Sequence, residues 1–182
     1  MSDRPTGTRA FVGVGSNIEP RRNIPAALRR LKVVVTVVGC STFYRTEPIG
    51  APHQPAFLNG LWEVRTDLPP RALKARLHAI EADLGRRRTA DPNAPRPIDL
   101  DLVVYGDLTC EEPDLVLPHP DLERDFVHAP LLELAPEILD GPLGDAIGGW
   151  IGRTPARRPT GEPDRSLTGA LRAMLEGEQQ GM

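Results

Sequence analysis

Apolar residues recur along the chain with two spacings, one typical of strands and the other of helices. Alternating or continuous apolar runs predict strands over residues 9–17, 32–44, 57–66 and 98–106. Apolar residues three or four positions apart predict helices over 23–31, 70–84, 121–134 and 143–151. Asn23 is the expected N-cap of the first helix. The repeated order of strand, helix and strand favours an α+β sandwich of the ferredoxin-like kind, with helices packed on a mainly antiparallel sheet.

A polar stretch with several prolines, residues 153–164, divides the chain into two unequal parts. We expect one domain over 1–152, which is long enough to bury a core. The composition of the stretch predicts a flexible C-terminal tail over 153–182. Within that tail, apolar residues from Leu167 to Leu175 have helical spacing, but a helix this short is marginal without a surface to pack on.

Two acids interrupt the apolar run at 98–106. Side chains alternate along a strand, so Asp99 and Asp101 point from one face and Ile98, Leu100, Leu102 and Val104 from the other. Neighbouring carboxylates repel each other unless a cation lies between them, and Mg²⁺ is typically held by one or two carboxylates plus substrate phosphates. An edge strand with a solvated polar face is the alternative, and the Asp-x-Asp pattern alone favours that alternative.

Two other strands carry residues that suit a ligand. Gly13 and Gly15 suggest a dinucleotide motif, but Ile18 stands at the third glycine position, so that motif fails. The glycines instead keep one strand face free of side chains, either for packing or for the close approach of a ligand. Phe57 and Asn59 share a strand face and could stack on and hydrogen-bond a flat heterocycle, although a phenylalanine alone is more often a core residue.

Charge and composition narrow the functional classes. The chain has 22 Lys+Arg and 25 Asp+Glu, a net charge of −3, which does not support a general binder of nucleic acid or of acidic membranes. Only Lys32 and Lys74 are lysines, so almost all positive charge is arginine, which grips phosphates bidentately; biased codon usage explains this enrichment equally well. The arginines at 86–88 precede the Asp99 strand, where a phosphate would need them.

Several other classes are excluded by inspection. The two cysteines lie far apart, which suggests neither a zinc site nor a disulfide framework. No Walker motif occurs, so the chain is not a P-loop kinase. The first nine residues are too polar for a signal peptide, and no apolar run approaches the ~20 residues of a membrane span. We therefore expect a cytoplasmic protein with no membrane partner.

Short ordered stretches resemble the 6-hydroxymethyl-7,8-dihydropterin pyrophosphokinase family over about residues 9–152. The matching stretches are Val14–Asn17, Phe43–Gly50, Gln54–Asn59, Pro95–Asp101 and Leu117–Pro120, and the Arg-x-x-Asp-x-Asp piece is the family's signature. The resemblance implies an ATP-dependent diphosphotransferase of folate biosynthesis. It would move the diphosphoryl group of ATP to the pterin's hydroxymethyl oxygen and release AMP. It implies a monomer with small-molecule substrates and no nucleic-acid partner.

The resemblance also assigns roles to individual residues. The implied catalytic residues are Arg86, Arg96, Asp99 and Asp101, of which Asp99 and Asp101 would hold two Mg²⁺ ions. The implied pterin-binding residues are Thr46, Pro48, Ile49, Phe57, Asn59 and Phe126. The implied ATP-binding residues are Glu81, Arg86, Arg88, Arg96, Ile98, His119 and Arg124.

Two departures from the family pattern keep an alternative open. Many relatives carry an Arg-Trp pair where this chain has Pro92-Asn93-Ala94, in a loop that closes over ATP, and lids commonly set the rate of such enzymes. The spacing from His119 to Phe126 is one residue shorter than usual. The alternative is a catalytically weak paralogue that binds pterin or nucleotide. Retention of the paired acids favours the enzyme, and the acidic balance disfavours a ferredoxin-like nucleic-acid binder.

Overall fold

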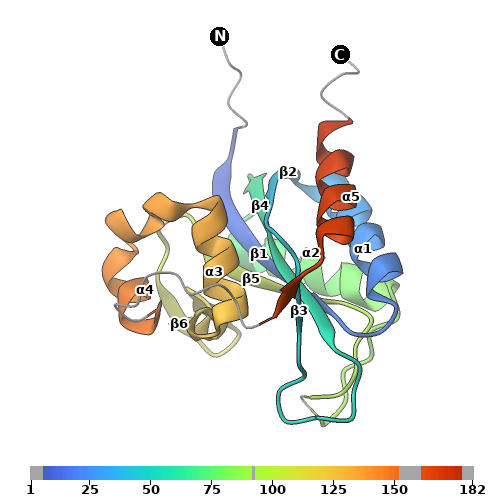
Figure 1. Cartoon of the computed structure of the whole chain (residues 1–182). Coiled ribbons are helices and arrows are strands. Elements are labelled where there is room, and N and C mark those ends of the chain that lie inside the picture. The colour runs from blue at the N-terminus through green and yellow to red at the C-terminus, as the bar shows by residue number, and fades with distance from the viewer. Residues whose placement is uncertain (1–5, 92, 152–160, 178–182) are drawn as a thin grey trace.

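A computed structural model describes residues 6–91, 93–151 and 161–177. Its centre is an antiparallel sheet in the order β5-β1-β4-β3-β8, with β2 paired to the other half of β4 (Figure 1). The described strands of this sheet are β1 (Thr8–Ser16), β2 (Thr36–Cys40), β3 (Tyr44–Thr46), β4 (Phe57–Thr66), β5 (Asp99–Tyr105) and β8 (Glu162–Pro163). A separate hairpin joins β6 (Cys110–Glu112) to β7 (Leu115–Leu117).

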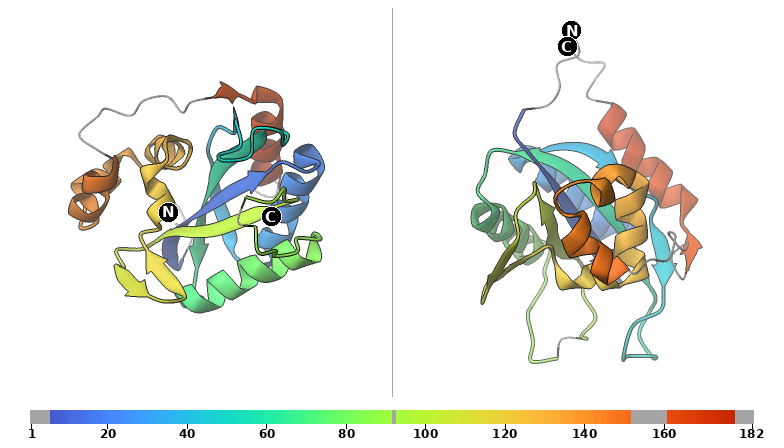
Figure 2. Two further views of the ribbon diagram at one scale, coloured as in Figure 1. Left: turned by 90° about the horizontal axis from the view of Figure 1, so that it is seen from below. Right: turned by 90° about the vertical axis from the view of Figure 1, so that its left-hand side faces the viewer.

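Helices cover both faces of the sheet (Figure 2). One face packs on α1 (Pro20–Val34), α2 (Pro70–Asp83) and α5 (Arg165–Glu176). The other face packs on the 3-10 helix η1 (Pro120–Glu123), α3 (Asp125–Leu134) and α4 (Gly144–Ile151), with η2 (Pro136–Asp140) beside them. The predicted α+β sandwich with a mainly antiparallel sheet is therefore confirmed. None of the described helices has the length and apolar character that crossing a membrane requires.

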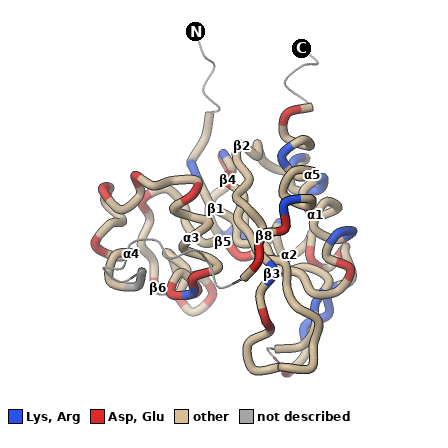
Figure 3. Tube along the Cα trace, in the orientation of Figure 1, with Lys and Arg blue, Asp and Glu red and all other residues tan. Residues whose placement is uncertain are grey.

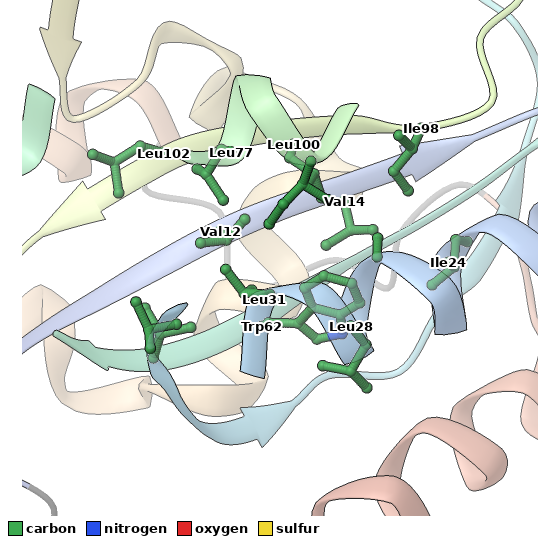
Figure 4. Close-up of a cluster of buried hydrophobic side chains, with 14 of the residues drawn as sticks. Val12, Val14, Ile24, Leu28, Leu31, Trp62, Leu77, Ile98, Leu100 and Leu102 are labelled. Atoms are coloured by element: carbon green, nitrogen blue, oxygen red, sulfur yellow. The ribbon is translucent and has the colours of Figure 1, made fainter. Parts of the chain in front are cut away.

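The larger of the two core clusters lies between the sheet and α1, α2 and α5. Trp62 of β4 packs there with leucines of α1, and Leu100 of β5 packs with leucines of α2 (Figure 4). The alternation predicted for β5 holds for Ile98, Leu100 and Leu102, which all belong to this cluster. It is wrong for Val104, which lies in the second cluster. The cause is a register shift between Phe11 and Val12, which changes the alternation of side chains along β5.

The first helix begins earlier than its apolar pattern predicts. Pro20 occupies the first turn of α1, where its fixed φ suits a helix and its missing N–H costs nothing. The N-cap is Glu19, in the left-handed region, so the prediction of Asn23 as N-cap is wrong. Asn23 is instead a buried helical residue whose Nδ2 donates to the Ile18 carbonyl oxygen (2.7 Å).

Residues 161–177 differ from the predicted flexible tail. The helical spacing in this segment forms α5, and Leu167 and Leu171 are buried against the core. Asp164 caps α5 by accepting from the Leu167 N–H (2.9 Å) and pairs with Arg21 (2.6 Å). The helix forms because β2 and α1 supply the partner surface that the sequence pattern does not reveal. Residues 153–160 and 178–182 lie outside the described residues, and the boundary at 152 stays a prediction.

Candidate active site

A cavity of about 560 Å³ opens at one end of the sheet, on the face covered by α3. Two loops border it, one between β3 and β4 and the other between α2 and β5, and both project from the same end of the sheet (Figure 1). The cavity floor comes from β1, β4 and β5, and its remaining wall from η1 and the start of α3. The site therefore forms where the covering helices leave the sheet exposed.

The floor exists because β1 has glycines where side chains would fill the space. Gly13 lies opposite Asp101 and Gly15 opposite Asp99 in the β1–β5 register, and Gly15 also lies opposite Asn59 of β4. A Cβ on Gly15 would stand 2.6 Å from Asn59 Oδ1, closer than real Cβ contacts. The two glycines thus leave room for three polar side chains from neighbouring strands on one concave surface, and the close approach of a ligand stays a prediction.

Asp99 is held by two arginines. Its Oδ1 accepts from Arg86 Nη1, and its Oδ2 accepts from Arg96 Nη1 (2.7 Å). Burial would raise the pKa of Asp99, but the two guanidinium groups outweigh burial and hold that pKa below its ordinary value. Asp99 is therefore charged at neutral pH and joins the arginines from both ends of the α2–β5 loop.

Asp101 lies on the same strand face but in a less favourable electrostatic environment. Burial, together with the negative charge of Asp99, raises the pKa of Asp101 to about 6. The His119 side chain opposes this shift only in part. Above pH 6 the cavity thus contains two carboxylates of which one lacks full compensation, as expected where a cation binds.

Asp101→Asn is expected to stabilise the ligand-free chain near pH 7.5. The pKa of Asp101 rises from 3.8 to about 6 on folding. The ionised side chain therefore destabilises the fold, by an amount that grows from pH 4 to pH 6 and is complete above that range. The gain should reach about 1 to 3 kcal/mol at pH 7.5 and be smaller at pH 5. Urea unfolding of both proteins at the two pH values measures it, and equal gains would contradict the assignment.

Glu81 lies beneath the site rather than in its wall. Its side chain is 2% exposed, accepts from the Leu100 N–H (2.7 Å), and pairs with Arg86 (2.5 Å) and Arg88 (3.2 Å). Burial raises the pKa of Glu81, while the Leu100 N–H and Arg86 lower it. Glu81 and the fully buried Ile98 are not among the residues that line the cavity, and their assignment to ATP stays a prediction.

The second part of the cavity is suited to a flat ligand. Phe57 and Asn59 line it from β4, and Asn59 Nδ2 donates to Thr46 Oγ1 (2.6 Å) across the β3–β4 pair. Pro48 and Ile49 line its rim, where Ile49 is 58% exposed. The Arg96 guanidinium lies 5.8 Å from the centre of the Phe57 ring. Arg96 thereby contacts both the Phe57 ring in this part of the cavity and the Asp99 carboxylate in the first part.

The wall opposite β4 carries the remaining predicted residues. His119, Arg124 and Phe126 all line the cavity, and the Arg124 guanidinium lies 5.8 Å from the Phe126 ring centre. The Asp121 N–H donates to His119 Nδ1 (3.1 Å), so in the neutral imidazole Nε2 carries the proton. Arg88 also lines the cavity. Apart from Glu81 and Ile98, the structure brings all residues that the resemblance names into one site.

Side-chain amides that the sequence analysis did not single out link the β3–β4 loop to the α2–β5 loop by hydrogen bonds. Asn17 Nδ2 donates to Gln54 Oε1 (3.1 Å), while Asn17 Oδ1 accepts from the Arg96 N–H (2.8 Å). Gln54 Nε2 then donates to the Asn93 carbonyl oxygen (2.7 Å). The sequence places Asn17 and Gln54 in stretches that match the family, but it does not show their contacts, because the partners of Asn17 lie 37 and 79 residues away.

The donor set of the cavity fits Mg²⁺ bound together with a phosphorylated ligand. Within residues 6–91, 93–151 and 161–177, no group of three or more His, Cys, Asp or Glu side chains could hold a metal. Mg²⁺ keeps several waters and needs only one or two protein carboxylates when phosphates complete its shell. Asp99 and Asp101 meet this demand, and the raised pKa of Asp101 shows a carboxylate that a cation would stabilise.

Charge is distributed unevenly around the site (Figure 3). Acidic residues gather over α3, α4 and the β6–β7 hairpin, and most basic residues lie on the side of α1, α2 and α5. The arginines at 86–88 begin three residues after Asp83, the last residue of α2, and so belong to the basic side. In the site itself the two charges meet on β5, where Arg86 and Arg96 both pair with Asp99.

Together, the fold and the site define an α+β protein whose cavity places arginines and carboxylates beside an aromatic ring and an amide. The family model described as 7,8-dihydro-6-hydroxymethylpterin-pyrophosphokinase matches residues 11–136. The chain therefore belongs to this family, and the resemblance found in the sequence is confirmed.

Individual relatives agree with this assignment. A 2-amino-4-hydroxy-6-hydroxymethyldihydropteridine pyrophosphokinase of Synechocystis sp. is 41% identical over 142 residues, which cover 76% of this chain and 72% of that protein. A protein of the same name from Pseudomonas aeruginosa is 38% identical over 134 residues, or 71% of this chain and 82% of that protein. The folic acid synthesis protein fol1 of Schizosaccharomyces pombe is 39% identical over 134 residues, 71% of this chain but only 18% of its own length.

Proposed function

We propose that this chain transfers the diphosphoryl group of ATP to the hydroxymethyl oxygen of 6-hydroxymethyl-7,8-dihydropterin and releases AMP, with two Mg²⁺ ions held by Asp99 and Asp101. One observation carries the proposal. A single cavity presents two carboxylates flanked by arginines and, next to them, a phenylalanine ring with an amide. The names of the Synechocystis and Pseudomonas relatives support the same reaction.

The part of the cavity around Asp99 and Asp101, which we call the phosphate half, would align the ATP phosphates and offset their charge. When bound, Mg²⁺ would supply positive charge that offsets the charge of the ATP phosphates. Asp99 and Asp101 are the residues that would hold it. Arg86 and Arg96, which pair with Asp99 in the ligand-free chain, would contact the transferred phosphates and spread their charge. Transfer of phosphoryl groups needs this positioning and electrostatic stabilisation more than covalent chemistry by the protein.

The part of the cavity around Phe57 and Asn59, which we call the pterin half, would orient the pterin. Phe57 and Phe126 line the cavity from opposite walls and would stack on the two faces of the pterin. Asn59, oriented by its bond to Thr46, would hydrogen-bond the pterin's polar edge together with backbone groups near Ile49. Arg96, next to the Phe57 ring, would bring the phosphates to the side of the pterin that bears the hydroxymethyl group.

Incubation with ATP, Mg²⁺ and 6-hydroxymethyl-7,8-dihydropterin is expected to release AMP in equal amount to the pterin diphosphate. Chromatography of the nucleotides measures the result, with reactions lacking pterin or containing EDTA as controls. Pterin binding without AMP release would instead support a catalytically weak paralogue, the alternative that the changed loop at residues 92–94 leaves open. AMP release that does not depend on pterin would contradict the assigned acceptor.

The assembly state and location of the enzyme complete the proposal. We propose a monomer, because one chain supplies every residue that we assign to the reaction. We propose a cytoplasmic location, because ATP is the co-substrate. Light scattering after size-exclusion chromatography measures the mass in solution against the 19.9 kDa of the chain.

A further inference from the structure

The C-terminal segment 161–177 lies outside the part of the chain that the family model matches, yet it pairs with β3, whose last residue, Thr46, lines the cavity. Its β8 extends the sheet by pairing with β3, with Glu162 opposite Arg45 and Pro163 opposite Tyr44. The contact is close, because a Cβ on Gly161 would stand 2.2 Å from the Arg45 carbonyl oxygen. The segment thereby turns β3 from an edge strand into one with neighbours on both sides.

The same segment holds both backbone polar groups of Phe43, the residue just before β3. Thr168 Oγ1 accepts from the Phe43 N–H (2.9 Å), and the Asp164 N–H donates to the Phe43 carbonyl oxygen (2.7 Å). Phe43 is fully buried and Thr168 is buried, so water does not replace these bonds. The conformation of the chain at Phe43 therefore depends on side-chain and backbone groups that come from the C-terminal segment.

The position of Phe43 affects the pterin half of the cavity through the pairing of β3 with β4. Its ring occupies the space beside Gly60, where a Cβ would stand 2.6 Å from ring carbons. Asn59 is the residue before Gly60, and it lies opposite Tyr44 in the β3–β4 register. The strand then places Thr46, the hydrogen-bond partner of Asn59, at the cavity wall. A shift of Phe43 would move β3 against β4 and change the orientation of the Asn59 amide.

We propose that Thr168 is a positioning residue for the pterin half of the site, acting through Phe43 and β3 on the Asn59 amide. The inference rests on the proposed function for the identity of the substrate, but not for the structural coupling. Thr168 acts on β3, which β4 and β1 separate in the sheet from β5, the strand of the phosphate half. Its influence should therefore fall on the pterin and not on ATP.

Thr168→Val tests this role in the full-length chain, since it keeps the shape of the side chain and removes the acceptor. The Michaelis constant for the pterin should rise about 2- to 10-fold, the loss expected for one buried hydrogen bond. The constant for ATP should change by less than about 2-fold, because the phosphate half is untouched. Thr168→Ser keeps the oxygen and should restore the wild-type constant. A lower melting temperature with both constants unchanged would show a merely structural role and overturn the proposal.

A readout without substrate separates this inference from the proposed function. The NMR resonances of the Asn59 side-chain amide should shift in Thr168→Val and return toward wild-type positions in Thr168→Ser. If the wild-type chain releases no AMP but these resonances shift as expected, the proposed reaction fails and the positioning role stands. If the Asn59 resonances are the same in all three proteins, the positioning role is wrong whatever the activity.

Discussion

Asp101→Asn is expected to lower AMP formation by at least about 100-fold, because a metal ligand and its charge are lost from the site where the transferred phosphates would lie. The same variant should fold more stably than wild type near neutral pH, as argued above from the raised pKa of Asp101. Loss of activity together with a gain in stability is the pattern expected of a carboxylate retained for its function. Initial-rate assays with saturating ATP and Mg²⁺, combined with urea unfolding, measure both effects.

Two controls sharpen this test. Asp107→Asn changes an exposed acid just beyond the end of β5 and should alter neither activity nor stability appreciably. Pterin affinity in the absence of nucleotide should be unchanged in Asp101→Asn, since Phe57 and Asn59 are intact. Full activity in Asp101→Asn would show that Asp101 does not hold a catalytic metal.

Arg86→Met is expected to have the largest effect on stability. Arg86 pairs with Glu81, which is almost fully buried, and with Asp99, so its removal leaves two carboxylates with less compensation. Breaking a buried ion pair by removing one partner typically costs about 3 to 5 kcal/mol. Activity should fall as well, because Arg86 is one of the two arginines assigned to the phosphates. Chemical unfolding and initial-rate assays measure the two losses.

A double variant separates the two roles of Arg86. Glu81→Gln with Arg86→Met removes the buried charge together with its partner, so much of the lost stability should return while activity stays low. Arg87→Met serves as the stability control, since Arg87 is exposed and adjacent in the chain. If Arg86→Met alone keeps wild-type stability, then Arg88 and the Leu100 N–H suffice to compensate Glu81.

The candidate carboxylates illustrate what local pattern can predict. Asp99 and Asp101 share a face because the period of a strand is two, and this holds wherever the strand lies in the fold. The same rule fails three residues later at Val104, because a register shift against β1 interrupts the alternation. The strand pattern also does not predict which of the two acids is paired with positive charge. Arg86 and Arg96 reach Asp99 only because of the way the α2–β5 loop folds.

The buried contacts of Glu81 and of α5 could not be predicted from the sequence for the same reason. The packing of α2 on β5 places the Glu81 side chain beneath the site, where it pairs with two arginines, and its assignment to ATP stays a prediction. The C-terminal helix was expected to be flexible, because its own sequence cannot show that β2 and α1 offer it an apolar surface. Both cases depend on which elements meet, which the spacing of residues within one element does not specify.

By itself, the sequence determined the types and order of most helices and strands, the α+β class, the paired acids and the family. These depend on local periodicity and on short motifs, whose physical causes act within a few residues. Only the tertiary structure decided that Gly13 and Gly15 form the floor of the cavity, that Asn17 and Gln54 link its loops, and that Thr168 holds Phe43. Those relations join residues 37 to 125 positions apart, and they arise from strand register and helix packing rather than from any local preference.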